Sequence, residues 1–287
     1  SLGSQWDYIE PVLFGHAAAL ALRHWWRTFR RGLDSRGVVQ CHEWLTGSAL
    51  LGLTESEPSL GTVFTTHATV LGRAASGSGR PLGPEAPLAL ADTLHVKSKH
   101  SLESVTAAEA DVFTTVSSIT AEEAALVLGR APDPILPNGV DLAVFDALVG
   151  DLDRGESRHR VRVLAQRFLG RPVDDAAILA ISGRYEFRNK GIDLLLDALG
   201  QLNLRKGRSV VLLVLVPAAN SGLRKPLLER LAGNAVTGGD PVGLSTHNLF
   251  DPDNDPIQRR CSELGLDNSP DSRGMIIHRP IYLRPGD

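Results

Sequence analysis

The sequence predicts an α/β protein made of parallel βα units, and three observations lead to this expectation. Short apolar runs rich in β-branched residues alternate with longer helical stretches. The expected strands run into polar loops, as parallel strands do at the carboxyl edge of a sheet. A length of 287 residues favours two domains over one. The break at Gly170-Arg171-Pro172 places the domain boundary there, so we expect one domain over residues 1–170 and a second over residues 171–287.

In the first half, strands and helices follow one another as βα units require. Pro11 suits a first helical turn and opens the first helix, and Thr120-Ala121-Glu122-Glu123 has the spacing of a capping box that starts the last one. The expected helices are Val12–Phe29, Trp44–Leu53, Lys97–Ala110 and Thr120–Leu128, and the expected strands are Gly37–Gln40, Thr62–Thr66 and Val112–Val116. The stretch Ala75–Ala91 is rich in Gly, Pro, Ser and Ala without an apolar period, so we expect a loop there.

In the second half, a charged helix precedes a fresh βα unit. The expected helices are Arg154–Leu169, Ile192–Leu202 and Pro256–Leu264, and the expected strands are Ala176–Ile181, Val210–Val216 and Met275–Ile277. The stretch Ala218–Asp253 is Gly- and Pro-rich and only weakly periodic, so we assign no element to it.

Composition narrows the class of protein. A hydrophobic fraction of 43% and a charged fraction of 22% are ordinary for a globular protein, and a net charge of −3 gives no reason to expect nucleic acid as a partner. Cys41 and Cys261 form neither a metal-binding spacing nor a disulfide framework, which fits a reducing compartment. The longest apolar run, Val210 to Pro217, is far shorter than the ~20 residues of a membrane helix. We therefore expect a cytoplasmic protein with no membrane partner, no metal and no cofactor.

The strongest functional signal is a loop between an expected strand and an expected helix. Its glycines let the backbone turn tightly, and the N-terminus of the next helix adds partial positive charge. Arg184 offers planar bidentate donors and Lys190 a compact ammonium, and both suit phosphate oxygens. The spacing allows a diphosphate site, but a solvated loop with Arg184 paired to Glu186 fits it equally well. The loop reads Gly183-Arg184-Tyr185-Glu186-Phe187-Arg188-Asn189-Lys190-Gly191, and it is neither a P-loop nor a Gly-x-Gly-x-x-Gly motif.

This loop resembles the donor-phosphate motif of the eukaryotic-type glycogen synthases, and further blocks match that family in the same order. These blocks are His42-Glu43-Trp44, Phe64-Thr65-Thr66-His67-Ala68-Thr69 with Leu71-Gly72-Arg73, Val112-Phe113-Thr114-Thr115-Val116-Ser117, Pro137-Asn138-Gly139, and Thr246-His247-Asn248 with Asp255-Pro256-Ile257. The resemblance covers about residues 11–280. It implies a GT-B fold of two Rossmann-like parallel-sheet domains, both only partly present. Residues 1–170 would be the remainder of the N-terminal, acceptor-side domain, and residues 171–287 the beginning of the C-terminal, donor-nucleotide domain.

The resemblance implies the reaction and the donor-binding residues. A retaining glucosyltransferase of this family moves glucose from UDP-glucose to the non-reducing end of an α-1,4-glucan. Arg184 and Lys190 would grip the diphosphate of the donor, with Arg73 near the phosphates. Asn138 would bind a sugar hydroxyl, although an asparagine before glycine is also an ordinary turn residue. Without the family, Arg73 would be interpreted as an ordinary surface arginine.

The resemblance also implies residues beside the reacting sugar and on the acceptor side. His67 would lie next to the donor glucose as the catalytic candidate, and His42 and Glu43 would lie at the acceptor side of the cleft. Without the family, the pattern favours His67 as an ordinary hydrogen-bonded loop residue after a strand.

Some family features are missing from this sequence. No glutamate has another eight positions later, so the family's Glu-x7-Glu pair is absent. The first strand with its Gly-rich loop, the arginine-rich effector helix and a long helical insertion between Val216 and Thr246 are absent as well. We therefore expect this chain alone to be inactive. The alternative function is a non-catalytic module that binds a sugar nucleotide or a glucan. The sequence leaves open whether the donor is UDP-glucose or ADP-glucose. It also leaves open the oligomeric state.

Overall fold

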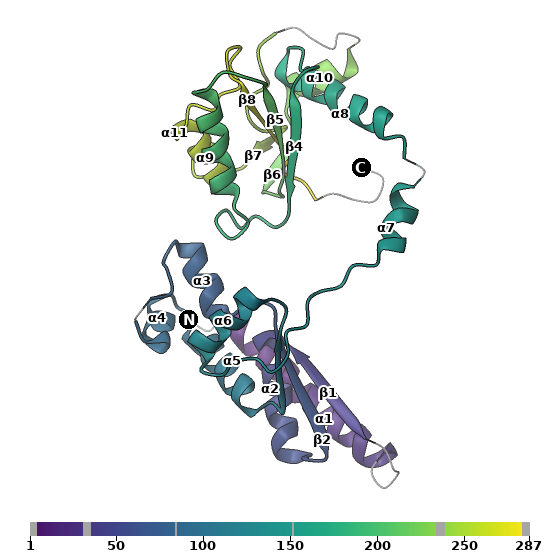
Figure 1. Cartoon of the computed structure of the whole chain (residues 1–287), viewed down its shortest axis with the longest axis vertical. Helices are drawn as coiled ribbons and strands as arrows, with labels where there is room; N and C mark the ends of the chain where they lie inside the picture. Colours follow the sequence, from purple (N-terminus) through teal and green to yellow (C-terminus); the bar gives the residue numbers. More distant parts are fainter. Residues whose placement is uncertain (1–4, 31–35, 84, 151, 234–238, 283–287) are drawn as a thin grey trace. The chain divides into compact units, whose positions relative to one another are not determined.

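The computed structural model describes residues 5–30, 36–83, 85–150, 152–233 and 239–282. The chain divides into two compact units, Ser1–Val140 and Asp141–Asp287. Each unit contains a three-stranded parallel sheet flanked by helices (Figure 1). The α/β class with parallel sheets is thus confirmed, in the form of two partial Rossmann-like domains.

The first unit alternates strands and helices as expected. Its elements are α1 (Trp6–Phe29), β1 (Gly37–His42), α2 (Glu43–Ser56), β2 (Leu60–Thr66), α3 (Val70–Ser78), α4 (Pro87–Thr93), α5 (Lys97–Glu109), β3 (Val112–Thr115) and α6 (Ser118–Leu128). The sheet order is β1-β2-β3, with His42 opposite Thr65 and Thr66 opposite Thr115. Because the strands are parallel and in this register, their carboxyl ends meet at one edge, where polar loops follow.

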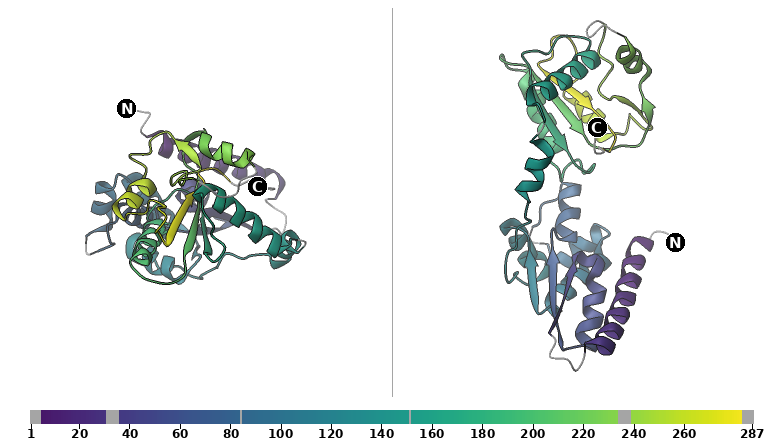
Figure 2. Two further views of the ribbon diagram at one scale, coloured as in Figure 1. Left: turned by 90° about the horizontal axis from the view of Figure 1, so that it is seen from above. Right: turned by 90° about the vertical axis from the view of Figure 1, so that its right-hand side faces the viewer.

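Helices cover the first sheet and bury its apolar side chains. The rings of Phe64 and Phe113, from neighbouring strands, stack with their centroids 5.7 Å apart in the core. Helix α1 packs against α2 and lies on the outside of the unit, as the second view of Figure 2 shows. Trp26 of α1 is buried with Leu53 and Leu60, whereas Trp25 is exposed.

Three expectations for the first unit are wrong in detail. Helix α1 begins at Trp6, so Pro11 lies inside it instead of opening it. Ser117, not Thr120, caps α6, because the Ser117 side chain accepts a hydrogen bond from the Thr120 N–H. The expected loop Ala75–Ala91 holds the end of α3 and most of α4, which are short helices that a Gly- and Ala-rich composition conceals.

The second unit begins with two helices and continues as βα units. Its elements are α7 (Leu142–Val149), α8 (Arg154–Leu169), β4 (Ala177–Ser182), α9 (Ile192–Asn203), β5 (Val210–Leu215), β6 (Asn220–Leu223), α10 (Lys225–Ala232), β7 (His247–Leu249), α11 (Pro256–Glu263) and β8 (Gly274–His278). The parallel sheet has the order β4-β5-β8, and β6 and β7 form a short antiparallel pair. The stretch Ala218–Asp253, to which no element was assigned, therefore contains β6, α10 and β7.

The second sheet is covered on both faces. Val211 and Met275 point to a cluster built with α8 and α10, whereas Leu212 and Ile276 point to a cluster built with α9 and α11. Successive strand residues face opposite sides, so the continuous apolar run from Val210 is what a doubly covered strand requires.

Helix α8 packs against the second sheet and belongs to the second unit. Phe168 and Leu169 are fully buried with the strands of the second sheet. The first compact unit accordingly ends at Val140, earlier than the boundary expected at residue 170. The assignment of the two units to acceptor and donor roles stays a proposal.

Candidate functional site

The loop between β4 and α9 begins and ends with glycines in backbone conformations that other residues rarely adopt. Gly183 has φ +152° and Gly191 has φ +66°. A Cβ atom on Gly183 would lie 3.9 Å from Cδ of Lys190, so the lysine stem runs past this glycine. Gly191 is also the N-cap of α9, which brings the partial positive charge of that helix N-terminus to the loop. The structure thus brings Lys190 and the start of α9 together.

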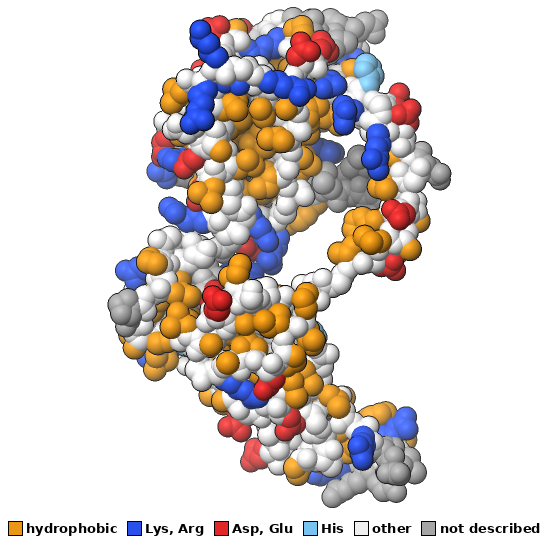
Figure 3. Space-filling model, viewed as in Figure 1, with side chains coloured by type: hydrophobic (Ala, Val, Ile, Leu, Met, Phe, Trp, Pro, Cys, Tyr) orange, Lys and Arg blue, Asp and Glu red, His pale blue; other side chains and the backbone are white. Residues whose placement is uncertain are grey.

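Side chains of the loop alternate between the core and the solvent. Tyr185 and Phe187 pack against the buried cluster of α9, β5 and α11, whereas Arg184, Arg188 and Lys190 are exposed. Basic side chains lie at this end of the second unit and also over other parts of its surface (Figure 3). The two aromatic rings therefore hold the loop to the core and leave its cations accessible.

Arg184 is paired within its own loop. Its Nη2 lies 2.9 Å from Oε1 of Glu186, and 66% of its side chain is exposed. This is the pairing that the sequence left open as the alternative to a phosphate site. Because the arginine of this ion pair is largely exposed to solvent, the pair is weak, and the guanidinium stays available to a more highly charged ligand.

Tyr185 ties the loop to α11. Its hydroxyl donates to Oδ2 of Asp255 over 2.6 Å and accepts from the Ile257 N–H over 3.2 Å. Oδ1 of Asp255 accepts from the Gln258 N–H over 2.9 Å and so caps the same helix. Burial raises the pKa of Tyr185 strongly, and the hydrogen bond to Asp255 raises it further, so the hydroxyl keeps its proton.

The Tyr185 ring also meets the end of β8. It lies edge-on to the ring of His278, with centroids 6.2 Å apart. His278 is fully buried, its Nε2 lies 3.0 Å from the Val216 carbonyl oxygen, and burial lowers its pKa. The loop is therefore anchored to both α11 and β8.

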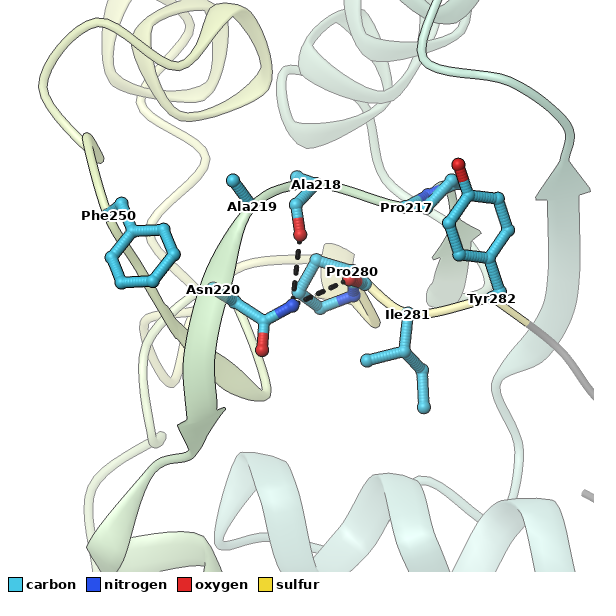
Figure 4. Close-up of a pocket in the computed structure, with 8 residues that line it drawn as sticks. All are labelled: Pro217, Ala218, Ala219, Asn220, Phe250, Pro280, Ile281 and Tyr282. Carbon is cyan, nitrogen blue, oxygen red and sulfur yellow. Dashed lines mark hydrogen bonds between the residues drawn. The ribbon is translucent and has the colours of Figure 1, made fainter.

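A cavity of about 670 Å³ opens at the same sheet edge, after β5 and β8 (Figure 4). The Asn220 side-chain amide joins two of its walls, donating to the carbonyl oxygens of Ala218 and Pro280 over 2.9 Å each. Phe250 and Tyr282 stand on opposite sides of the cavity and are largely exposed. The lining residues are Pro217, Ala218, Ala219, Asn220, Phe250, Pro280, Ile281 and Tyr282. Sequence reasoning missed this cavity, although a proline two positions after each of two strands was a usable signal.

In the first unit, three candidate residues meet at the carboxyl edge of the sheet. The His42 and His67 rings stack with centroids 5.4 Å apart, and Nδ1 of His42 lies 3.1 Å from Nε2 of His67. Oε1 of Glu43 accepts from the His67 backbone N–H over 3.0 Å. Glu43 itself has φ +61°, a left-handed conformation that a non-glycine residue adopts only under local constraint. The catalytic and acceptor-side candidates thus form one contiguous group.

Two carboxylates that the sequence did not single out as site residues, buried Glu103 and half-buried Glu123, hold the segment after β2. Glu103, fully buried, accepts from the Thr66 hydroxyl over 3.0 Å and from the Val70 N–H over 2.8 Å. Burial raises the pKa of Glu103 to about 7, and repulsion from Glu43 and Glu123 adds to the rise, against the hydrogen bonds from Val70 and Thr66 that lower it.

Glu123 holds the next part of the same segment. It accepts from the Thr69 N–H over 3.1 Å and from the Thr69 hydroxyl over 2.6 Å. A Cβ atom on Gly72 would lie 2.2 Å from Cδ of Glu123, so the glycine is what admits this carboxylate. Together the two acids fix the backbone that carries His67 and Arg73. Arg73 lies on α3, where its N–H donates to the Thr69 carbonyl oxygen over 3.0 Å.

Asn138 lies apart from this group. It is exposed in the segment between Ile135, which bridges to Thr115, and the division after Val140. His42, Glu43, His67, Arg73 and Asn138 belong to the first unit, and Arg184 and Lys190 to the second.

The described residues contain no cluster of His, Cys, Asp or Glu able to hold a metal ion. In the same residues, no helix is both long and apolar enough to cross a membrane. Cys41 and Cys261 are free and buried.

The chain has two partial Rossmann-like units, and each has polar side chains at the carboxyl edge of its sheet. This architecture is that of the GT-B-type α/β proteins. The family model described as glycogen synthase matches residues 5–242, and the chain belongs to this family.

The chain is also similar in sequence to individual glycogen synthases. The chain is 34% identical to glycogen [starch] synthase isoform 1 of Saccharomyces cerevisiae, with 88% of the chain and 46% of the relative covered. It is 31% identical to glycogen [starch] synthase of Dictyostelium discoideum, with 96% and 38% covered. It is 29% identical over 349 aligned positions to the yeast isoform 2, with 96% and 49% covered. The chain thus spans half or less of the length of these relatives. Because 349 positions exceed the 287 residues of the chain, isoform 2 also has inserted residues relative to it.

Proposed function

We propose that the protein is a glycogen synthase-like glucosyltransferase and that this chain supplies part of its donor and acceptor sites. The reaction would move glucose from UDP-glucose to the non-reducing end of an α-1,4-glucan with retention. The observation that carries the proposal is the Gly183–Gly191 loop, with exposed Arg184 and Lys190 beside the N-terminus of α9. Membership of the glycogen synthase family supports it.

The chemistry asked of this loop is electrostatic. Negative charge accumulates on the leaving UDP as the glycosidic bond breaks, and preorganised cations stabilise that charge. Arg184 and Lys190 supply two cations in the second unit, and we assign Arg73 of the first unit to the same task. His67 would hold the sugar at the reacting carbon, with its ring set by His42 and its backbone by Glu43.

The cavity after β5 and β8 suits the nucleoside of the donor. It lies at the same sheet edge as the diphosphate loop, and Tyr185 touches the end of β8 from that loop. Phe250 and Tyr282 offer aromatic faces, on which a base can stack. Residues from Asp141 onward would then form the donor side, and residues up to Val140 the acceptor side.

A second candidate function is a module that binds the sugar nucleotide without catalysis. The donor loop and the cavity after β5 and β8 would serve such a module equally well, because both are binding features. We expect this chain alone to bind UDP but to transfer no glucose. Cytoplasmic location also stays a prediction.

Calorimetry and a transfer assay test the proposal. The chain should bind UDP, and Phe250→Ala should weaken that binding by roughly tenfold, since stacking a base on an aromatic ring contributes about 1–3 kcal/mol. Phe29→Ala removes a similarly exposed phenylalanine from the first unit and should leave UDP affinity unchanged. A chain that binds no UDP would contradict the proposal. Transfer of labelled glucose to a maltooligosaccharide by this chain would show that its sequence already contains the catalytic groups.

A further inference from the structure

Tyr185 is the third residue of the donor loop and makes hydrogen bonds to the start of α11. The hydroxyl is bonded on both sides, donating to Asp255 over 2.6 Å and accepting from Ile257 N–H over 3.2 Å. The two oxygens of Asp255 divide their work, one holding Tyr185 and the other capping α11 at Gln258. One carboxylate therefore fixes both the loop and the helix start.

The cations that we assign to the diphosphate stand on either side of this anchor. Arg184 directly precedes Tyr185 in sequence, and Lys190 is joined to the same turn by its N–H, which donates to the Glu186 carbonyl oxygen over 2.9 Å. Both side chains are exposed, so few contacts with the core set their positions. The positions of the two cations must come mainly from the backbone between Gly183 and Gly191. The Tyr185 hydroxyl joins that backbone to α11 by hydrogen bonds, in addition to the packing of the Tyr185 and Phe187 rings.

We propose that Tyr185, through its hydrogen bond to Asp255, is a positioning residue that sets Arg184 and Lys190 for the donor diphosphate. This inference rests on the proposed function. In this inference Tyr185 affects binding of the phosphates and not of the nucleoside. The cavity assigned to the nucleoside is lined by residues after β5 and β8 and around β6 and β7, and Tyr185 is not among them. Loss of the hydroxyl should weaken diphosphate binding and spare nucleoside binding.

The test compares UDP with uridine on the whole chain. Tyr185→Phe keeps the ring packed and removes the hydroxyl, and Asp255→Asn keeps a cap for α11 and removes the acceptor of the Tyr185 proton. Each should weaken UDP binding by roughly tenfold, the scale of one hydrogen bond to a charged group, and the double variant should lose little more than either single one. Uridine affinity, measured by ligand-observed NMR, should stay within about twofold of wild type in each variant, since no hydrogen bond to it is lost.

Matched controls separate positioning from general damage. Tyr8→Phe removes a hydroxyl in the first unit, and Asp153→Asn alters the aspartate that caps α8; neither should change UDP binding. Hydrogen exchange should quicken in residues 183–191 of Tyr185→Phe and stay unchanged in β5 and β8. Wild-type affinity for UDP in Tyr185→Phe would overturn the inference alone. Equal losses for UDP and uridine would also overturn it, because they would indicate a general disturbance. A wild-type chain that binds no UDP would overturn the proposed function together with the inference.

Discussion

Arg184 and Glu186 form an ion pair inside the donor loop, with Nη2 and Oε1 2.9 Å apart. The residue assigned to the diphosphate is therefore already engaged by a carboxylate one residue beyond Tyr185. A bound diphosphate would have to draw the guanidinium away from Glu186 or share it. The carboxylate thus competes with the proposed ligand for the same donors.

Removing that competitor should strengthen donor binding. Glu186→Gln keeps the shape of the side chain and removes its charge, so UDP affinity should rise by roughly twofold to fivefold, the scale of an ion pair whose arginine is exposed to solvent. Calorimetry at low ionic strength measures it. Glu229→Gln, which breaks the exposed pair with Lys225 on α10, should leave the affinity unchanged. A drop in affinity for Glu186→Gln would mean that the carboxylate supports the site instead.

Gly72 should be intolerant of a methyl group. A Cβ atom there would lie 2.2 Å from Cδ of Glu123, so the carboxylate would have to leave Thr69. Gly72→Ala should destabilise the first unit by about 1–3 kcal/mol, the usual cost of overpacking. All four tryptophans of the chain lie in the first unit, so their fluorescence during urea unfolding reports on it.

The control for that variant is a glycine with space around it. A Cβ atom on Gly61 would meet Cγ2 of Val38 at 3.6 Å, an ordinary contact. Gly61→Ala should therefore change stability far less than Gly72→Ala. Equal effects of the two substitutions would contradict the role given to the Glu123 contact.

Glu103 should make the stability of the first unit depend on pH. Its pKa rises from 4.5 to about 7 on folding, chiefly by burial, so the folded protein holds this proton more tightly than the unfolded chain. The stabilisation is fully present below pH 4.5 and is lost as the pH rises through 7. Glu103 alone should lower the free energy of unfolding by about 3 kcal/mol over that window.

Glu103→Gln should remove this pH dependence while keeping the fold. The glutamine can donate to the Thr66 hydroxyl and accept from the Val70 N–H, as the protonated acid would. Unfolding curves at pH 5 and pH 8 should therefore differ less in this variant than in wild type. Glu109→Gln, on the exposed side of the same helix, should keep the wild-type difference. A glutamine variant with the full wild-type slope would show that another group titrates.

Local signals were enough to predict most of the fold. Helix α8 spans Arg154–Leu169 as expected, because Asp153 caps its start and Gly170 ends it in a left-handed conformation. Short helices without a clear apolar period escaped prediction: α4 lies in a stretch expected to be a loop, and α7 in a stretch with no assignment. Helix α8 packs against strands that are distant from it in sequence, and a local sequence pattern does not predict such contacts.

The candidate site, like the fold, was predicted from the sequence only in part. Family blocks predicted that His42, Glu43 and His67 are functional residues, and the parallel register explains why they meet at one sheet edge. Glu103 and Glu123 were missed because they act over 37 and 54 positions in sequence, from helices whose facing surfaces only the fold defines. The Tyr185–Asp255 bond joins residues 70 positions apart and was missed for the same reason.

The measurement that tests the central claim most directly is UDP binding to this chain with and without the Arg184 guanidinium. The account predicts that Arg184→Ala weakens UDP binding by roughly tenfold or more, because a charge-assisted contact to a phosphate is lost. Arg188→Ala removes another exposed arginine from the same loop, so it controls for net charge and should have little effect. Equal UDP affinity in wild type and Arg184→Ala, or equal losses in the two arginine variants, would contradict the assignment of this loop to the donor diphosphate.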